Sequence, residues 1–377
     1  MVEWKKLVSV SDVQYGYPFE SSLFSEDSTY IPLIRIRDVK PAKASTYYSG
    51  DILNDFIIKM GDILVGMDGE FNLGKWNDRD GLLNQRVLKL SGKAGICIDG
   101  YLYHYMGPVF KQIEKQTPGG SVKHLSAKII KEIVIPLPSL SEQNRIVGIL
   151  DTFTSSIENL KQQIAERRKQ FEHYRDQLLD LEGKEGVEMK TLGEIGEFIR
   201  GNGIQKNDFV DDGFSCIHYG QIHARYGFSA KETISKIEES LYKKCKKAKK
   251  GDVVLATTSE DAEGVAKPFV WLGDDEAAVS GDAFIYHHNQ IGKFMGHQFL
   301  THKFMQFKVK YATGAKVVRI SGDNMAKYEV TLPSINEQSR IVSILDTFEA
   351  SIANLEAQLS QREKQYEYYR NKLLTFE

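Results

Sequence analysis

The sequence predicts an α+β protein in which two mixed α/β globular domains are separated by two long helices that pair as an antiparallel coiled coil. Residues 138–182 and 333–377 repeat each other, with 26 of 45 positions identical at a constant offset of 195. The stretches before each copy share a fainter repeat. We therefore expect a first globular domain (1–137), a first helix (138–184), a second globular domain (185–332) and a C-terminal helix (333–377).

Each helical segment opens with a helix-start pattern. Ser139-x-x-Glu142 and Ser334-x-x-Glu337 match capping boxes, and a proline precedes each. Apolar residues then recur at a 3-4 spacing over about five heptads, and such a stripe often packs a surface helix on its own domain. Two matched stripes of equal length favour pairing of the helices with each other. The expected shared seam consists of Phe153, Ile157, Ile164, Phe348, Ile352 and Leu359.

The globular stretches repeat their framework more closely than their surfaces. EWKKLVSVSDV (3–13) resembles EMKTLGEIGEF (188–198), and KMGDILVG (59–66) resembles KKGDVVLA (249–256). Short β-rich runs punctuated by Gly and Asp predict twisted sheets in both stretches. This pattern is expected of one frame that presents two different binding surfaces.

Composition excludes several classes of protein. The three cysteines (Cys97, Cys216 and Cys245) lie far apart and form no metal-binding or disulfide spacing, which predicts a reducing cytoplasm. No apolar run reaches the length of a membrane span, and the N-terminal segment has no export signal. We expect a cytoplasmic protein that makes no membrane contact.

Candidate catalytic motifs are incomplete. Residues 69–76 match the phosphate-loop pattern G-x4-G-K, but Trp76 stands where Ser or Thr must hold magnesium. No Asn/Asp-Pro-Pro-aromatic motif for amino-group methylation occurs, and the histidine pairs lack a metal-binding context. We expect no catalytic residue, no metal site and no cofactor in this chain.

Three features together resemble the specificity subunits of type I restriction–modification systems, over the whole chain. They are the doubled P-S-x-x-E-Q-x-R-I-V-x-I-L-D-x-F start of a long helix, the run GDILVGMDG at 61–69, and Asn84-Gln85-Arg86-Val87. The resemblance implies a non-catalytic, sequence-specific subunit. Each globular domain would be a target recognition domain that reads one half of a split, asymmetric DNA site, and the paired helices would fix the spacer between the halves.

The resemblance also implies partners for this chain. The helices would dock modification (methyltransferase) subunits, two per chain, which bind S-adenosylmethionine and methylate adenine. Motor-nuclease subunits using ATP and magnesium would join in a restriction-competent system. The formal net charge of −2 is unlike that of a protein that grips double-stranded DNA alone, so we expect the partner to supply much of the phosphate contact.

Expected DNA contacts are polar, basic and aromatic residues in loops beside the repeated segments, because such side chains read base edges and phosphates. A solvated surface role is the alternative for each of them, and Asn84-Gln85 is also compatible with a buried structural pair. In the first domain the candidates are Tyr15, Tyr17, Arg35, Arg37, Asp68, Asn84, Gln85, Arg86, Lys123 and His124. In the second they are Asn202, Gln205, Lys206, His218, Tyr219, Gln221, Thr258, Ser259, Lys316 and Arg319.

Three other functions remain open from the sequence. A coiled-coil scaffold that binds only proteins is the main rival, although a pure spacer needs no diversified surfaces. A specificity subunit of a related methyltransferase–nuclease system without a motor subunit is the second. The third is a nucleotide-dependent enzyme built around Gly69–Lys75, which a test of ATP binding would decide.

Overall fold

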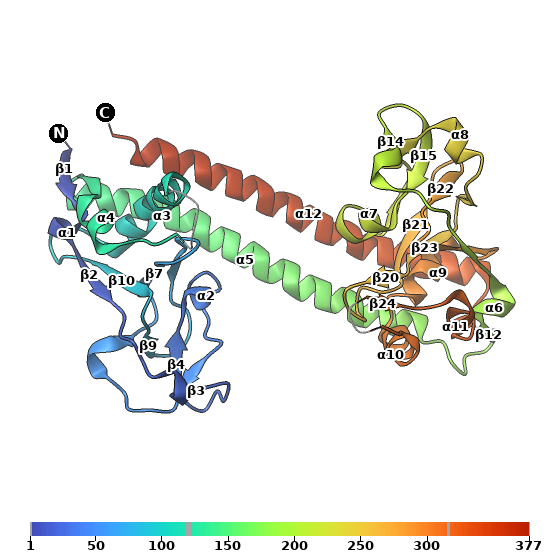
Figure 1. The fold of residues 1–377 in the computed structure, drawn as a ribbon, viewed down its shortest axis with the longest axis horizontal. Coiled ribbons are helices and arrows are strands. Elements are labelled where there is room, and N and C mark those ends of the chain that lie inside the picture. Colours follow the sequence, from blue (N-terminus) through green and yellow to red (C-terminus); the bar gives the residue numbers. More distant parts are fainter. Residues whose placement is uncertain (1, 118–122, 315–316, 377) are drawn as a thin grey trace. The chain divides into compact units, whose positions relative to one another are not determined.

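The computed structural model describes residues 2–117, 123–314 and 317–376. Contacts divide the chain into two compact units, Met1–Lys161 with Ala357–Glu377, and Gln162–Glu356 (Figure 1). Each unit contains a globular α/β part and portions of both long helices, α5 (Leu140–Leu179) and α12 (Ile335–Leu374). The predicted class, two mixed α/β parts with two long helices, is confirmed.

The first unit holds two small sheets. One has the strand order β2-β10-β7-β8 and is antiparallel throughout. The other has the order β3-β5-β4-β9-β6 and contains one parallel pair, β4 with β9. A separate ribbon pairs β1 with β11, the strand that leads into α5. The strands are β1 (Glu3–Lys6), β2 (Ser11–Tyr15), β3 (Phe24–Ser25), β4 (Ile31–Ile34), β5 (Tyr47–Tyr48), β6 (Ile57–Ile58), β7 (Ile63–Gly66), β8 (Leu73–Lys75), β9 (Gly81–Leu83), β10 (Val87–Gly92) and β11 (Val134–Leu137).

The second unit repeats this plan. Its sheets have the orders β13-β23-β19-β21-β16 and β14-β17-β15-β22-β18. One ribbon pairs β12 with β25, and another pairs β20 with β24. The parallel pair β15 with β22 is the counterpart of β4 with β9. The strands are β12 (Glu188–Thr191), β13 (Gly196–Arg200), β14 (Phe209–Val210), β15 (Phe214–Ile217), β16 (Ser229–Ala230), β17 (Ser235–Ile237), β18 (Lys247–Ala248), β19 (Val253–Ala256), β20 (Thr258–Ser259), β21 (Lys267–Trp271), β22 (Ala277–Val279), β23 (Ala283–His288), β24 (Val318–Arg319) and β25 (Glu329–Leu332).

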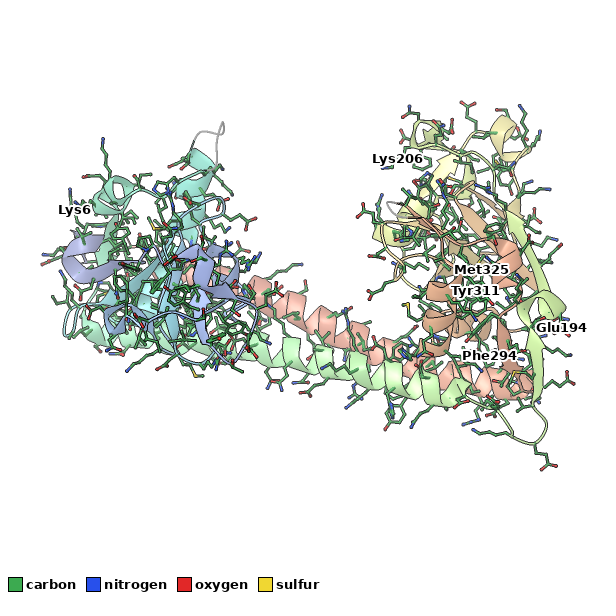
Figure 2. All side chains as sticks on the ribbon, turned by 60° about the horizontal axis from the view of Figure 1, so that its bottom comes forward. Lys6, Glu194, Lys206, Phe294, Tyr311 and Met325 are labelled. Carbon is green, nitrogen blue, oxygen red and sulfur yellow. The ribbon has the colours of Figure 1, made fainter. Side chains whose placement is uncertain are left out.

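Shorter helices connect the sheets to α5 and α12. In the first unit α3 carries a buried face that packs on the sheet and on the start of α5. In the second unit Phe294 of α9 lies beside the long helices, whereas Lys206 lies on the part of the unit away from them (Figure 2). These helices are α1 (Leu7–Val10), α2 (Ile36–Val39), α3 (Asp99–Gln116), α4 (Ala127–Glu132), α6 (Leu192–Ile195), α7 (Tyr219–Ala224), α8 (Glu239–Tyr242), α9 (Gly292–Gln298), α10 (His302–Tyr311) and α11 (Gly322–Met325). Short 3₁₀ turns cover Ser21–Leu23, Asn54–Phe56 and Lys206–Asp208.

The same glycine contact closes the frame in both units. A Cβ atom added to Gly16 would lie 2.0 Å from the carbonyl oxygen of Asn84, and one added to Gly201 would lie 2.3 Å from that of Ser280. Backbone cannot yield at such distances, so only glycine fits at either position. In the first unit, the loop that follows β2 is therefore held against the loop between β9 and β10. In the second unit, the loop that follows β13 is held against the loop between β22 and β23.

The long helices run antiparallel within each unit. In the first unit Phe153 stacks on Tyr369 at 5.2 Å and Lys161 pairs with Glu363 at 3.5 Å. In the second unit Arg168 pairs with Glu356, and Phe348 contacts Phe171 at 6.3 Å and Tyr174 at 5.4 Å between ring centroids. Residue numbers rise along one helix as they fall along the other, which confirms the predicted antiparallel arrangement within each unit.

The predicted seam is unevenly buried. Ile157 and Ile164 are each 8% exposed, whereas Ile352 and Leu359 are only half-buried. Full burial occurs nearer the helix starts instead, where Ile146, Leu150, Ile341 and Leu345 are 0% exposed. Those four residues belong to the cores of their own units. The helices therefore use one part of the stripe to pack on their domains and another to pack on each other.

Each expected capping box forms only one of its two hydrogen bonds, the one from the backbone amide to the serine hydroxyl. The Ser139 hydroxyl accepts from the Glu142 amide at 3.3 Å, and Ser334 accepts from Glu337 at 3.4 Å. The glutamate side chains do not return to the cap. Glu142 pairs instead with Arg145 at 2.7 Å, because the guanidinium one turn onward offers two charged donors.

A fully buried glutamine fixes the start of each long helix to its globular part. The Gln143 side-chain amide donates to the Ile96 and Pro138 carbonyls and accepts from the Ile98 amide, at 2.9–3.0 Å. Gln338 repeats two of these bonds, donating to the Pro333 carbonyl at 3.0 Å and accepting from the Ile291 amide at 3.2 Å. The repeated Glu-Gln pair of the sequence thus supplies an anchor as well as a cap.

Among the described residues, no helix is both long and apolar enough to cross a lipid bilayer.

Candidate nucleic-acid interface

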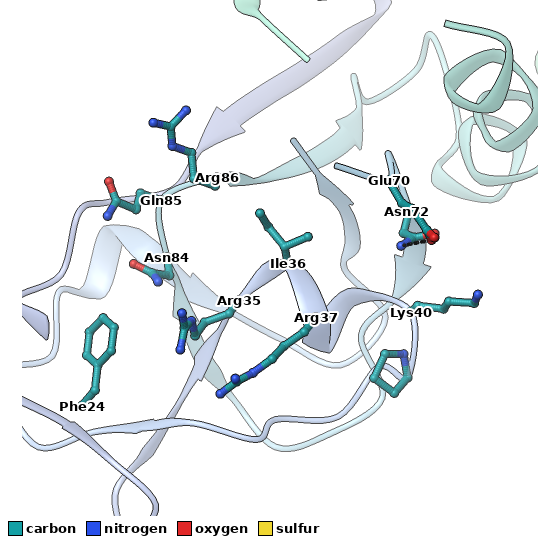
Figure 3. A pocket seen from close by; sticks show the side chains of 11 residues that line it. Phe24, Arg35, Ile36, Arg37, Lys40, Glu70, Asn72, Asn84, Gln85 and Arg86 are labelled. Atoms are coloured by element: carbon teal, nitrogen blue, oxygen red, sulfur yellow. Dashed lines mark hydrogen bonds between the residues drawn. The ribbon is translucent and has the colours of Figure 1, made fainter. Parts of the chain in front are cut away.

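A recess of about 590 Å³ opens on the first unit where the β9–β10 loop meets the start of α2 (Figure 3). Four cationic side chains and one carboxylate line it, so the local charge is positive although the chain as a whole is nearly neutral. Five of the predicted contact residues belong to its wall. The lining residues are Phe24, Arg35, Ile36, Arg37, Lys40, Pro41, Glu70, Asn72, Asn84, Gln85 and Arg86.

Two arginines of this recess are held by their neighbours. Arg37 donates from Nε to the Ser45 hydroxyl at 2.9 Å and from a terminal nitrogen to the Thr46 hydroxyl at 2.7 Å. The Arg35 guanidinium lies 5.7 Å from the centroid of the Phe24 ring. A guanidinium that lies over an aromatic face can keep its N–H donors available for a ligand.

The adjoining Asn84–Arg86 loop presents three polar side chains of different exposure. Asn84 is only 5% exposed, and its side-chain oxygen finds no hydrogen-bond partner among the described residues. Gln85 is exposed. Arg86 has a backbone φ of 70°, a left-handed conformation that L side chains rarely adopt. Non-glycine residues in this conformation cluster at functional sites.

Arg86 also meets a second group of predicted residues. Its Nε lies 3.5 Å from a carboxylate oxygen of Asp68, and the other Asp68 oxygen accepts from His124 Nδ1 at 2.5 Å. An isolated β-bridge joins Asp68 to His124. The structure therefore brings Asp68, Arg86 and His124 together at the edge of the recess.

The second unit has a recess of about 560 Å³ at the equivalent place. Four predicted residues, Gln205, Lys206, His218 and Tyr219, line it. His218 is 6% exposed, and burial together with the nearby Lys206 charge holds the pKa of its imidazole below the usual value, so the ring is neutral at pH 7. The remaining lining residues are Arg200, Gly201, Gly203, Ile204, Ser280, Gly281 and Asp282.

Sequence reasoning missed Ser280, Gly281 and Asp282. They occupy the places of Asn84, Gln85 and Arg86 in the frame, because Tyr17 bridges to Asn84 as Asn202 bridges to Ser280. The two triplets share no residue, so the repeat was not visible there. Aligning the flanking strands GLL (81–83) with AAV (277–279) would have located them.

Other first-unit candidates lie apart from the recess or serve the fold. Tyr17 packs its ring on Phe19 and Phe56 at 5.1 and 5.2 Å. Tyr15 ends β2 and is 38% exposed. Lys123 donates its ammonium to the Glu114 carbonyl at 2.7 Å, near the C-terminal end of α3.

The other second-unit candidates divide in the same way. Gln221 is 9% exposed and donates to Ser235 at 2.6 Å, so it sits within the domain wall. The Asn202 side chain accepts from the Lys246 amide. Thr258 pairs with Arg319, and Ser259 with Val318, in the β20–β24 ribbon, the counterpart of the Asp68–His124 bridge. Lys316 lies outside the described residues.

The geometry contradicts the nucleotide-binding interpretation of Gly69–Lys75. Gly74 and Lys75 lie in strand β8 and not at the start of a helix, and Lys75 points its ammonium to the Tyr103 ring at 4.7 Å. Trp76 is buried. No cluster that could hold a metal ion occurs within residues 2–117, 123–314 and 317–376. The three cysteines are free and buried.

Two copies of one α/β frame, each with a polar recess and each attached to a long helix, define a duplicated recognition domain. The chain belongs to the type I restriction modification DNA specificity domain family, whose model matches residues 1–167 and again 184–363.

Relatives agree with this assignment. A putative type I restriction enzyme specificity subunit from Haemophilus influenzae is 27% identical, over all of this chain and 96% of its own length. The EcoR124I/EcoR124II specificity subunit of Escherichia coli is 34% identical over 65% of this chain and 63% of its own length. The EcoBI specificity subunit of Escherichia coli is 35% identical over 45% of this chain, and that match spans only 36% of the EcoBI subunit.

The fold also matches solved structures. A type I restriction–modification system S subunit from M. genitalium superimposes with a TM-score of 0.59 and 16% identity, covering all of this chain and 97% of that one. A second structure, described as showing complex assembly and conformational transition of the type I system, gives a TM-score of 0.57 and 16% identity.

Proposed function

We propose that this chain is the DNA-sequence-recognition subunit of a type I restriction–modification complex, and that each unit reads one half of a bipartite, asymmetric site. The observation that carries the proposal is the pair of equivalent recesses, built on one frame but lined by different side chains. A repeated frame places two readers alike, and different linings make them select different sequences. A scaffold that binds only proteins would need neither.

The helices set the spacer in this proposal. Each has 40 residues and so rises ~60 Å at ~1.5 Å per residue. Matched faces of B-DNA recur every ~34 Å, which is within the reach of such a helix. Because Gln143 and Gln338 anchor the helix starts, the length between anchors would govern how many base pairs are left unread.

The chain itself performs no chemistry in this scheme. Modification subunits, two per chain, would bind S-adenosylmethionine and methylate adenine, and restriction subunits would bring ATP and magnesium where they are present. The duplicated helix start supports a count of two, since each copy offers the same surface to a partner. A solved structure with this fold concerns complex assembly of the type I system, and this supports docking of partners on the fold.

A methylation map tests the proposal. A host carrying this chain and its modification subunit should contain methyladenine in one split, non-palindromic sequence. Exchange of residues 1–137 for the corresponding segment of another family member should change only one half of that sequence. Lengthening α5 and α12 together should change only the gap. A continuous palindromic site, or an exchange that altered both halves, would contradict the proposal.

DNA affinity should depend strongly on the modification subunits. The chain carries 49 Lys and Arg against 51 Asp and Glu, so few phosphates can be neutralised by the chain alone. We expect the isolated chain to bind its site weakly and with little selectivity, and the complex to bind far more tightly at the same salt. Fluorescence anisotropy with a duplex bearing the mapped site measures this. Equal affinity with and without the partner would refute the expectation.

A further inference from the structure

We propose that the two units read base-edge groups of opposite hydrogen-bond polarity at one equivalent position. Arg86 of the first unit contacts a base that presents acceptors, as guanine does. Asp282 of the second unit contacts a base that presents an exocyclic amino group, as cytosine and adenine do. The inference rests on the proposed function and deepens it by naming the chemistry of one base in each half-site.

The equivalence of Arg86 and Asp282 is set by the backbone. The Met67 amide donates to the Arg86 carbonyl at 2.8 Å, and the Thr257 amide donates to the Asp282 carbonyl at 3.0 Å. Each residue directly precedes a long central strand, β10 or β23. Each also lines its recess. The frame therefore presents one side chain at the same place in both units.

Arg86 is positioned to meet a ligand. Its side chain is 55% exposed, and its contact with Asp68 is a long one at 3.5 Å. Its φ of 70° would suit glycine, yet the position holds the largest cationic side chain. A guanidinium carries donors only, in a planar fork that matches the O6 and N7 acceptors of guanine.

The recess wall beside Arg86 offers a complementary group. Ser280, the counterpart of Asn84, accepts from the Tyr219 amide at 2.9 Å and is satisfied inside the fold. Asn84 is only 5% exposed, and its side-chain oxygen has no hydrogen-bond partner among the described residues. A buried acceptor without a donor is costly, and a ligand donor in the recess would satisfy it.

Asp282 has the opposite chemistry. Its carboxylate is 36% exposed, and the Arg200 guanidinium approaches it only to 3.9 Å while donating at 2.9 Å to the Gly281 carbonyl. A carboxylate accepts hydrogen bonds and therefore selects the amino groups of cytosine N4 or adenine N6 over guanine O6 and N7.

The test uses the complete complex of this chain with its modification subunits. Methylation rates are measured on a duplex library randomised at each position of the mapped site. Arg86→Gly is the informative variant, because glycine tolerates the left-handed backbone, and Arg86→Lys keeps the charge but loses the planar fork. Both should relax selection at one G·C pair in one half, by roughly 5- to 150-fold. Asp282→Ala should relax one position in the other half, where the strand that is read carries C or A.

Base analogues separate base reading from phosphate contact. Replacing the selected guanine with 7-deazaguanine should slow the wild-type complex and leave the Arg86→Gly complex unchanged. Lys6→Ala removes an exposed cation that pairs with Glu132 at 3.3 Å outside the recess, and should change neither half.

Several outcomes would overturn the inference while leaving the proposed function intact. They are a uniform loss of rate on every sequence in the Arg86 variants, relaxation of the same half by the Arg86 and Asp282 variants, or unchanged selection in either. Absence of any split methylated sequence with the wild-type complex would instead overturn the proposed function.

Discussion

Replacing Ile157 with alanine should lower the free energy of unfolding by about 2–5 kcal/mol, the usual cost of removing a buried isoleucine side chain. Ile157 is 8% exposed on the face of α5 that carries Phe153, which stacks on Tyr369 of α12. Packed neighbours relax only partly around a deleted side chain, so part of the vacated space remains as a cavity. Urea unfolding of the full chain, followed by circular dichroism, measures the loss.

The repeat provides matched controls for this prediction. Ile352 occupies the same place in the second copy but is half-buried, so Ile352→Ala should cost clearly less. Lys161→Ala removes an exposed ion pair with Glu363 and should cost no more than about 1 kcal/mol. Equal losses for Ile157 and Ile352, or a loss at Lys161 as large as at Ile157, would contradict a buried seam.

Local periodicity explains why the helices could be predicted. A 3-4 apolar spacing and a serine cap are properties of consecutive residues, and the duplication doubled that signal. The uneven burial of the seam was not predictable, since Ile157 and Ile352 look alike in sequence and differ only in what the fold packs around them. The role of Gln143 was missed for the same reason, because its partners Ile96 and Ile98 lie more than forty residues earlier in the chain.

The candidate site was predictable where the residues themselves are distinctive. Arg35, Arg37 and the Asn84–Arg86 triplet were predicted because arginine and amide side chains are typical base readers, and the fold brings them to one recess. Asp282 was missed because an aspartate in a Ser-Gly-Asp turn resembles any surface turn. Only the strand pairing shows that it replaces Arg86. Whether each candidate contacts DNA stays a prediction.

The second unit should also lose about 2 kcal/mol of stability through His297 alone when the pH falls from 7 to 5. His297 is 0% exposed, and neither ring nitrogen has a hydrogen-bond partner among the described residues. Burial, together with the charges of Arg175 and Lys293, lowers the pKa of His297 from 6.5 to about 3. The folded chain thus keeps the ring neutral while the unfolded chain takes up a proton near pH 6.5. The contribution of the neutral His297 ring to the free energy of unfolding is fully present above that pH, and it is lost progressively as the pH falls toward 3.

His297→Leu isolates this contribution, because leucine cannot take up a proton and remains compatible with the ring of Phe228, which stacks on His297 at 4.2 Å. Urea unfolding between pH 7 and 5 should show a shallower pH dependence for the variant. The slope of the free energy of unfolding against pH should correspond to close to one proton fewer than in the wild type. Some slope should remain, since burial lowers the pKa of His288 to about 4. His104, the counterpart in the first unit, differs in having partners, Asp151 at 2.7 Å and Tyr366 at 3.0 Å. Asp151 opposes the effect of burial on the His104 pKa, so His104→Leu should flatten the pH profile less and cost more at pH 7. An identical pH slope in wild type and His297→Leu would show that His297 is not a buried neutral histidine.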